Sequence, residues 1–488
     1  MPGDELAPSI GVLARPLGDL PDPLPIPVMR RPFDASASPP GSKSIANRAL
    51  LLAALAGGES VIRNLPVGAD DVDVMVRALG QLGARLRVES PGDRGVSIRV
   101  SGVGGRWRVP PEGVRLDARG AGTAARFLMA AALLGAPGSG PITIDGNAQL
   151  RARPMGGLAA ALRALGAQVR SQTDRDRLPM RIVPPADPDR VPGSVEIGAG
   201  ESSQFRSALM LVAPFLPRGL TIVATAPPPS PGYIEMTHRL LCAVGGAVSG
   251  SDPATGPCGS AYVPRWSAAP GGIAGFELDV EPDASSAAVL LTAAVLTGSA
   301  LAVPGLTVGG SLQPDAGFVR VAEAFGARAR PGGLVGVRGS GPLRPIDVTL
   351  RPMPDTALVA AVLAGFVPGE GGRPRTTTLR GLGTLRDKEC DRLAALRAEL
   401  AKVGVEVEII TAGADEGLRL TPAPGGIGWG PSVAPVVFET YDDHRVAMAL
   451  ALIGLRRAGV AVRNPACVAK SYPAFWRDLA GLCGKGSA

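Results

Sequence analysis

The chain has 488 residues, of which 45% are hydrophobic, and its formal net charge is +7 with a pI near 9.5. This length allows a large buried core and more than one domain, while apolar runs of only about ten residues exclude a span of the roughly 20 residues that a bilayer requires. The positive charge favours acidic partners and leaves nucleic acid and small anionic metabolites open.

The N-terminal stretch, residues 1–30, is rich in proline with interspersed acidic residues. It lacks the apolar core of a secretory signal and the acid-poor bias of a transit peptide, so we expect a loose tail. The five cysteines show neither metal-ligand spacing nor a dense disulfide pattern: Cys242, Cys258, Cys390, Cys467 and Cys483. We therefore expect a cytoplasmic protein without a membrane partner.

An amphipathic helix that ends in glycine recurs about every 80 residues along the chain. The first copy is "VMVRALGQLGARLRV" from Val74. Later copies begin at Gly157, Glu235, Gly317 and Arg392, with a weaker one at Tyr472, and the terminating glycines are Gly83, Gly166, Gly245, Gly326, Gly404 and Gly484. An alternating segment such as "VEVEII" follows several copies, which is typical of a helix that leads into a strand.

A second kind of helix alternates with the first. Its six copies are "SKSIANRALLLAAL", "GTAARFLMAAALL", "SSQFRSALMLVAPF", "DASSAAVLLTAAVL", "PDTALVAAVLAGF" and "DDHRVAMALALIGL". Each copy opens with small polar or charged residues and is then apolar nearly all round, so it must be buried. Each unit then holds one buried helix, one amphipathic helix and short strands. The pattern predicts an α/β protein of two similar halves with three units each.

The polar start of each buried helix predicts an anion site, because a helix N-terminus carries unpaired N–H groups and a partial positive charge. Ordinary N-capping explains any single copy equally well. The few lysines add a second signal. Lys43, Lys388 and Lys470 lie among polar residues, where a compact ammonium can meet one oxygen or move a proton, whereas Lys402 and Lys485 are expected to be solvated.

The segment "PGSKSIANRALLLAAL" closely resembles the N-terminal signature of 5-enolpyruvylshikimate-3-phosphate synthases. Further blocks that resemble this family follow in order between residues 39 and 476, among them "GAGTAARFL", "LRDKECDRLAAL", "YDDHRVAMAL" and "CVAKSYPAFW". The resemblance implies the two-domain enolpyruvyl transferase fold, an inside-out α/β barrel with three repeated α/β units per domain. Crossovers near Gly41 and Glu281 would give a discontinuous domain of 31–41 with 282–488 and a second domain of 42–281.

The resemblance implies transfer of the enolpyruvyl group of phosphoenolpyruvate to the 5-hydroxyl of shikimate 3-phosphate, inhibition by glyphosate at the phosphoenolpyruvate site, and no cofactor or metal. The positions that match the shikimate 3-phosphate site are Lys43, Ser44, Arg48, Ser202, Ser203, Gln204, Ser230, Tyr233, Asp355, Thr384 and Lys388. Those that match the phosphoenolpyruvate site are Lys43, Gly122, Arg153, Gln204, Arg392, Arg445 and Lys470. We expect a monomer that binds these small anions and no nucleic acid.

Asp355 and Glu389 match the family's acid and base carboxylates. The reaction must remove the proton of the 5-hydroxyl and add one to carbon 3 of the enol, and two carboxylates in different surroundings can divide these roles. Nearby cations should keep Asp355 ionised as the acceptor, with Glu389 and Lys43 as candidate donors. The alternative for Asp355 is a helix N-cap.

The chain departs from the family's usual pattern at two places. Arg119 and Gly120 stand where Gly-Asn usually precedes "AGT", which removes an amide and adds a cation. Thr384 stands where an asparagine is frequent, and its hydroxyl can still bond to a phosphate. These departures bear on affinity and substrate choice more than on the type of reaction.

Three other functions fit the sequence less well. The related transferase that acts on a UDP-sugar carries a cysteine just before its Arg-Pro, and "DGNAQLRARP" has none. A nucleic-acid binder would need aromatic residues along a basic stripe, but only 4% of the residues are aromatic. A hydrolase triad would have to use His238 or His444, and neither belongs to a serine-elbow motif.

Overall fold

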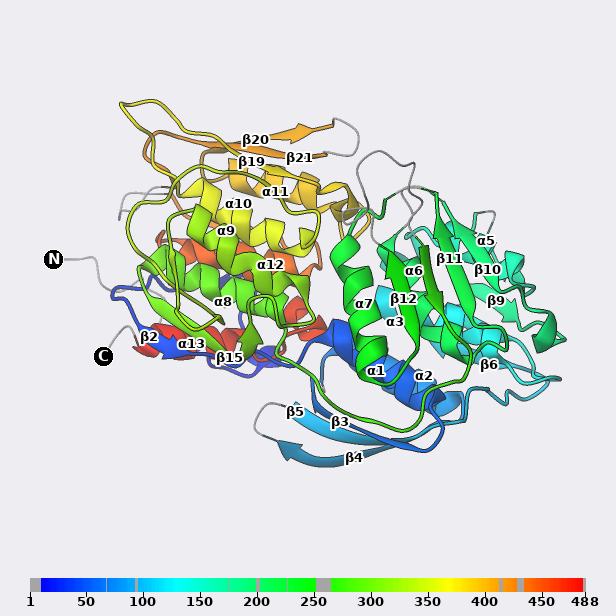
Figure 1. Cartoon of the computed structure of the whole chain (residues 1–488). Helices are drawn as coiled ribbons and strands as arrows, with labels where there is room; N and C mark the ends of the chain where they lie inside the picture. The colour runs from blue at the N-terminus through cyan, green and yellow to red at the C-terminus, as the bar shows by residue number, and fades with distance from the viewer. Residues whose placement is uncertain are drawn as a thin grey trace. The chain divides into compact units, whose positions relative to one another are not determined.

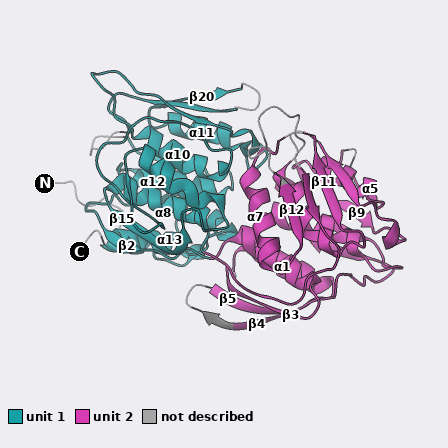
Figure 2. Cartoon of the chain, in the orientation of Figure 1, with its two compact units in different colours: residues 1–40, 282–488 teal, residues 41–281 magenta. Residues whose placement is uncertain are grey.

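The chain forms two compact units in this computed structural model (Figure 2). Unit 1 consists of Met1–Pro40 and Pro282–Ala488, and unit 2 consists of Gly41–Glu281. The structure describes residues 10–66, 68–92, 95–173, 175–198, 202–225, 227–251, 265–411, 416–427 and 434–485, so Cys258 lies outside the described residues. The chain first passes between the units after Pro40, one residue before the expected boundary, and it returns after Glu281 as expected.

Three apolar helices contact one another inside each unit in the described part of the chain (Figure 1). They are α1 (Lys43–Leu55), α3 (Gly122–Ala131) and α6 (Ser203–Val212) in unit 2, and α8 (Ala284–Thr297), α10 (Ala357–Gly365) and α12 (His444–Gly454) in unit 1. Every residue of α10 is buried, as are 13 residues of α8. A helix without a polar face is stable only where neighbours cover it. The burial of these helices agrees with the sequence prediction.

Within the described ranges, six further helices bury one face each. They are α2 (Asp70–Gln81), α5 (Gly156–Ala164), α7 (Pro231–Ala243), α9 (Phe318–Ala324), α11 (Arg392–Ala401) and α13 (Phe475–Lys485), and a short α4 (Ala148–Arg151) precedes α5. Five of the predicted terminating glycines have the positive φ that favours glycine. The prediction that Gly484 ends a helix is wrong, because Gly484 lies inside α13.

Each unit holds three small sheets among the described residues. In unit 2 the strand orders are β14 (Glu277–Asp279), β3 (Glu59–Leu65), β5 (Gly95–Ser101), β4 (Arg85–Gly92); β6 (Val114–Asp117), β7 (Ile142–Asp145), β9 (Met180–Val183), β8 (Gln168–Ser171); and β10 (Ser194–Ile197), β11 (Leu220–Ala224), β13 (Arg265–Ala268), β12 (Val248–Ser251). In unit 1 they are β2 (Asp34–Ser36), β15 (Ala300–Thr307), β17 (Leu334–Arg338), β16 (Arg328–Ala329); β18 (Asp347–Thr349), β19 (Thr377–Arg380), β21 (Gly417–Pro422), β20 (Val405–Ile410); and β22 (Val436–Phe438), β23 (Val460–Val462), β1 (Leu24–Pro25).

Where the chain passes between the units, the strand before a buried helix pairs with a strand that follows a different buried helix. In four sheets the strands before and after a buried helix pair in parallel, as β18 and β19 do around α10. At the crossovers, β2 precedes α1 but pairs with β15, which follows α8, whereas β14 precedes α8 but pairs with β3, which follows α1. This exchange keeps every sheet within one unit although the chain passes between the units twice.

The segment expected to be a loose tail packs against unit 1 from residue 10 onward, so this expectation is wrong for residues 10–30. Leu13, Leu24, Ile26 and Met29 are at most 4% exposed. β1 pairs antiparallel with β23 and completes the sixth sheet, where proline is tolerated because β1 is an edge strand. Apolar residues between the prolines thus hold the segment in place. None of the helices in the described ranges is long and apolar enough to cross a membrane.

Candidate active site

A buried arginine joins three carboxylates in unit 1. Arg392 is the first residue of α11, and its side chain is 1% exposed. Its Nη1 donates to Asp355 (2.8 Å), its Nη2 to Glu389 (2.9 Å) and its Nε to Asp443 (2.7 Å). A planar guanidinium with five donors fixes the relative orientation of the groups it binds. The structure thus brings together the two carboxylates that were predicted to be acid and base.

Asp355 lies among cations rather than at a helix cap. It belongs to the short helix η8 (Pro354–Thr356), whose N-cap is Met353, so the N-cap alternative is wrong. Lys388 Nζ is 3.2 Å from Asp355 Oδ1, and Arg445 Nη2 is 3.6 Å from Oδ2. Burial alone would raise the pKa of Asp355, but these cations and Arg392 outweigh it and hold that pKa well below its ordinary value. Asp355 is therefore an ionised carboxylate.

Glu389 is paired with Lys470 as well as with Arg392. Lys470 ends the helix η11 (Pro465–Lys470), and its Nζ is 3.0 Å from Glu389 Oε1. Burial lowers the pKa of the adjacent Lys388, although the negative charge of Asp355 opposes that shift. All the cations predicted in this half of the chain thus meet around two carboxylates. The cations of such a cluster can bind an anionic ligand by giving up a contact with a carboxylate and forming one with the ligand.

Thr384 and Asp315 extend this cluster in different ways. Thr384 lies in η9 (Gly383–Leu385), which contacts η8, and its buried hydroxyl has no hydrogen-bond partner among the described residues. Asp315 lies in η7 (Pro314–Gly317) and accepts a hydrogen bond from Ser285 Oγ (2.7 Å). Burial, together with the charge of Asp355, raises the pKa of Asp315 to about 6.

In unit 2, Lys43 is held by a buried carboxylate. Lys43 is the first residue of α1, and its Nζ donates to Asp71 Oδ2 at 2.9 Å. Arg119, the cation that departs from the family pattern, lies 3.1 Å from Asp70, the residue next to Asp71. Both members of the Arg119 pair are about half exposed. The added cation therefore has its own carboxylate and leaves the pairing of Lys43 intact.

Two buried arginines approach the start of α3, where Gly122 is the first residue. A Cβ at Gly122 would lie 2.7 Å from Arg153 Nη1 and 3.4 Å from Arg126 Nη1. Glycine leaves room for these guanidinium groups, and a side chain here would displace the end of Arg153. Arg126 also donates to the amide oxygen of Gln204, and Gln204 Nε2 donates to Thr123 Oγ1 at 3.2 Å. Gly122, Arg153 and Gln204 thus lie around Arg126, and their predicted contact with phosphoenolpyruvate stays a prediction.

The predicted serines gather where α6 and α7 begin. Ser202 is the N-cap of α6, and its Oγ accepts from the N–H of Gln204 at 3.3 Å. The adjacent Ser203 accepts from the N–H of Ser230 at 3.1 Å, and Ser230 is the N-cap residue of α7. Hydroxyl groups beside two helix N-termini can bind a phosphate or a polar ring.

Arg48 is 2% exposed and binds groups within unit 2. Its Nε donates to Thr237 Oγ1 (2.8 Å), its Nη1 to the carbonyl of Ser44 (2.8 Å) and its Nη2 to Ser207 Oγ (3.3 Å). The Tyr233 carbonyl also accepts from Nη2, at 3.5 Å. Burial lowers the pKa of Arg48 to about 9. Arg48 therefore links α1, α6 and α7, and its predicted contact with a substrate stays a prediction.

Sequence reasoning left four supporting residues out of the predicted sites: Asp71, Arg126, Asp315 and Asp443. A signal for Arg126 was present, because a charge inside a helix that is apolar all round needs a buried partner. Asp443 is likewise the polar start of a buried helix. Asp71 lies in a run of acidic residues, "DDVD", in which the pattern does not single out one carboxylate.

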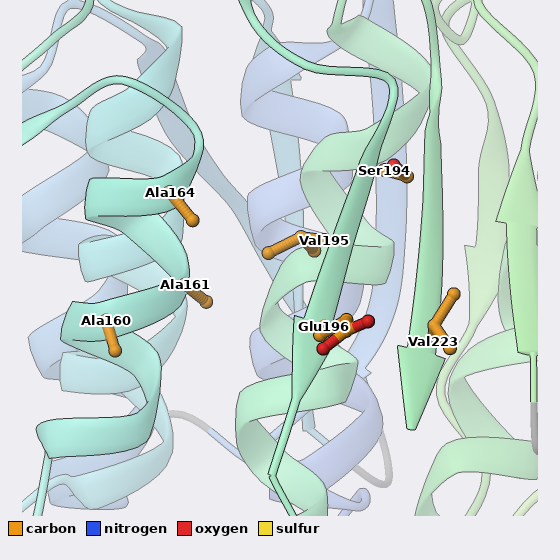
Figure 3. A pocket seen from close by; sticks show the side chains of 7 residues that line it. All are labelled: Ala160, Ala161, Ala164, Ser194, Val195, Glu196 and Val223. Atoms are coloured by element: carbon orange, nitrogen blue, oxygen red, sulfur yellow. The ribbon is translucent and has the colours of Figure 1, made fainter. Parts of the chain in front are cut away.

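A pocket between α5 and the strands β10 and β11 contains none of the predicted residues (Figure 3). Its wall consists of small or apolar side chains together with Ser194 and one carboxylate, Glu196. A carboxylate without a cation in the pocket wall would repel anions. This pocket is therefore unsuited to the anionic ligands that the cationic groups above favour.

Comparison with known proteins places the chain in a family. The model of the EPSP synthase family, 3-phosphoshikimate 1-carboxyvinyltransferase, matches residues 30–479. The chain belongs to this family. The 3-phosphoshikimate 1-carboxyvinyltransferase of Ralstonia pickettii strain 12J is 37% identical over 452 residues, which cover 91% of this chain and 95% of the relative. The enzyme of that name from Syntrophobacter fumaroxidans is also 37% identical, over 92% of this chain and 97% of the relative.

Solved structures show that the fold is that of the enolpyruvyl transferases. The EPSP synthase of Acinetobacter baumannii superposes with a TM-score of 0.70 at 22% identity, covering 92% of this chain and 96% of that one. The enolpyruvyl transferase NikO of Streptomyces tendae gives 0.66 at 17% identity, covering 94% and 96%. The predicted fold class is thus confirmed, and it agrees with the small sheets and buried helices of this chain.

Proposed function

We propose that this protein transfers the enolpyruvyl group of phosphoenolpyruvate to the 5-hydroxyl of shikimate 3-phosphate and releases phosphate. The observation that carries the proposal is the sharing of Arg392 by Asp355 and Glu389, at 2.8 and 2.9 Å, in a chain of the EPSP synthase family. Two carboxylates fixed beside cations supply what the reaction needs, namely a proton acceptor, a proton donor and charges that offset anionic substrates.

Each substrate has a proposed set of residues. Shikimate 3-phosphate is bound by hydroxyl groups, amides and cations, namely Lys43, Ser44, Arg48, Ser202, Ser203, Gln204, Ser230, Tyr233, Asp355, Thr384 and Lys388. Phosphoenolpyruvate carries a phosphate and a carboxylate, which suits the cation-rich set Lys43, Gly122, Arg153, Gln204, Arg392, Arg445 and Lys470. Buried arginines support this proposal, because a guanidinium binds either anion through two parallel hydrogen bonds.

The proton transfers follow from the charges. Asp355 accepts the proton of the 5-hydroxyl while the hydroxyl oxygen bonds to carbon 2 of the enol. Carbon 3 gains a proton from Glu389 or Lys43. The group that gave the proton then takes one back from carbon 3 of the tetrahedral intermediate, as the bond between carbon 2 and the phosphate oxygen breaks. Asp355 returns its proton to the leaving phosphate. The low pKa makes free Asp355 a weak base. Substrate anions that engage its cations would raise this pKa toward a useful range.

One assay tests the proposed function. Phosphate release is measured with both substrates together and with each alone, and we expect release only when both are present. Release from phosphoenolpyruvate alone would indicate a phosphatase, and no release from the pair would contradict the proposal. Replacing shikimate 3-phosphate with UDP-N-acetylglucosamine should abolish the reaction. Release with this acceptor would favour the related sugar-nucleotide transferase instead.

We also propose that the protein acts as a cytoplasmic monomer that does not bind nucleic acid. The cysteines among the described residues are free thiols, which suits a reducing compartment. Light scattering should give the mass of one chain, 49.5 kDa. Cell fractionation should recover the enzyme with cytoplasmic markers, and an electrophoretic mobility assay should show no shift of RNA at physiological salt.

A further inference from the structure

A strained turn precedes the buried helix α12. The N–H of Asp443 donates to the carbonyl of Thr440 at 2.9 Å, which closes a four-residue turn. The two central residues, Tyr441 and Asp442, both have φ of +55°. Turns with positive φ at both central positions are normally formed by glycine, asparagine and aspartate, because a bulky L-residue such as tyrosine is strained there. Such a conformation persists only where the surroundings enforce it.

Each central side chain of this turn is held by its own partner. Tyr441 Oη donates to Oε1 of Glu399 at 2.8 Å, although the tyrosine itself is 42% exposed. Glu399 is 1% exposed, and its Oε2 accepts from the N–H of Glu439 (2.9 Å) and from Lys402 Nζ (2.6 Å). On the other side, Asp442 Oδ1 accepts from Asn464 Nδ2.

The turn ends on Asp443, which binds the side chain of Arg392 and the backbone N–H of Arg445. Asp443 caps α12 by accepting from the N–H of Arg445 at 2.9 Å, and it also accepts from Arg392 Nε at 2.7 Å. Arg392 and Glu399 lie two turns apart on α11, so this helix meets the turn region at two points. A change in the turn would therefore move Asp443, and with it the guanidinium that contacts Asp355 and Glu389.

We propose that Glu399 and Asn464 are positioning residues for the transfer reaction. They touch no substrate in this proposal, which rests on the proposed function above. Their hydrogen bonds hold the turn of residues 440–443 in its strained conformation. Through Asp443, the turn then fixes the side chain of Arg392 and the backbone of Arg445. Asn464 is itself fastened, because its N–H donates to Asp22 Oδ1 (3.1 Å) in the segment before β1.

The variants Glu399→Gln and Asn464→Gly test this proposal. Asn464 has φ of +43°, so glycine keeps the backbone conformation and removes only the side-chain bond. We expect each variant to lower kcat/KM for phosphoenolpyruvate about 10- to 100-fold, since a shift near 1 Å in a positioned group can cost that much. Hydrogen exchange of the Arg445 amide should also become faster. The matched controls are Glu408→Gln, at an exposed residue paired with Arg419, and Asn64→Gly, at another asparagine with positive φ.

A rescue variant distinguishes positioning from a general loss of stability. Glycine adopts positive φ without strain, so adding Asp442→Gly to Asn464→Gly should restore most of kcat/KM. Equal losses in the controls, no rescue, or unchanged exchange at Arg445 would each overturn the proposal. If the wild type released no phosphate from its two substrates, the proposed function would fail, whereas the exchange measurement would still decide whether these residues hold the turn.

Discussion

The candidate-site cations of the two units differ in the groups that they contact: mainly carboxylates in unit 1 and mainly neutral oxygens in unit 2. In unit 1, Arg392 contacts three carboxylates, and Lys388, Arg445 and Lys470 each lie near a carboxylate as well. In unit 2, Arg48 contacts hydroxyl and carbonyl oxygens, and Arg126 contacts the amide of Gln204.

This difference indicates a division of labour. Ionised carboxylates can accept and return protons, and cations tune their pKa values, so the unit 1 group suits the proton transfers. Hydroxyl groups and amides do not titrate near neutral pH, but they orient a polar ring through directional hydrogen bonds. The unit 2 group therefore suits substrate binding. The pair of Lys43 with Asp71 is the exception, and it fits the candidate role of Lys43 as a proton donor.

The largest expected effect is the loss of turnover in Asp355→Asn. The amide keeps the shape of the side chain but cannot accept the hydroxyl proton, so kcat should fall about 10²- to 10⁴-fold. Binding of shikimate 3-phosphate, measured by calorimetry, should change much less because most of its proposed ligands lie in unit 2.

The matched variant for this test is Ser203→Ala in unit 2. It should weaken shikimate 3-phosphate binding with a smaller effect on kcat. If Asp355→Asn kept its turnover, the proposed division between the two groups would be wrong.

A second test compares Arg392→Met with Arg48→Met. Removing Arg392 leaves the buried Asp443 and two carboxylates that are 11% and 8% exposed, Asp355 and Glu389, without their common partner. Breaking a buried ion pair in this way costs about 3–5 kcal/mol. Removing Arg48 leaves neutral groups, and Thr237 and Ser207 already bond to each other at 2.9 Å, so the cost should be about 1–3 kcal/mol.

Thermal unfolding of both variants measures this difference, with Arg419→Met as an exposed control that should change stability by less than about 1 kcal/mol. If Arg48→Met lost as much stability as Arg392→Met or more, contacts with carboxylates would not distinguish the unit 1 arginine from the unit 2 arginine.

Asp315 allows a test through the pH dependence of stability. Its pKa is raised from 3.8 to about 6, so the stability it contributes is complete below about pH 4 and is lost as the pH rises through 6. Asp315→Asn cannot ionise and can still accept from Ser285. The variant should therefore be more stable than the wild type by up to about 3 kcal/mol at pH 7, with the difference shrinking to nothing near pH 4. A difference that does not change between pH 4 and 7 would contradict the raised pKa.

The sequence predicted the repeated architecture well because burial leaves a periodic trace. Helices such as α8 and α10 have no polar face, and glycines that have positive φ recur after the amphipathic helices, so the sequence pattern revealed the units. The packing of residues 10–30 was missed, because a short edge strand rich in proline has no periodicity that distinguishes it from a tail.

The candidate site was predictable in its residues but not in its pairing. Motifs identified Asp355, Glu389 and Arg392, yet no spacing indicates that one guanidinium would bind both carboxylates and Asp443 together. The strain at Tyr441 was equally hidden, because positive φ at a tyrosine is imposed by partners distant in sequence, here Glu399.

The smallest expected effect, a change in selectivity, concerns Gly122 in unit 2. In Gly122→Ala the new methyl group would lie 2.7 Å from Arg153 Nη1, the far end of a long side chain that can move by a few tenths of an ångström. We expect glyphosate, the longer occupant of the phosphoenolpyruvate site, to be weakened more than phosphoenolpyruvate by about tenfold, the lower end of what one methyl group achieves in a fitted pocket. The glyphosate inhibition constant and the KM for phosphoenolpyruvate, measured in both proteins, decide the matter. If both rise by the same factor, the methyl group acts only by displacing Arg153, and Gly122 does not distinguish the two ligands.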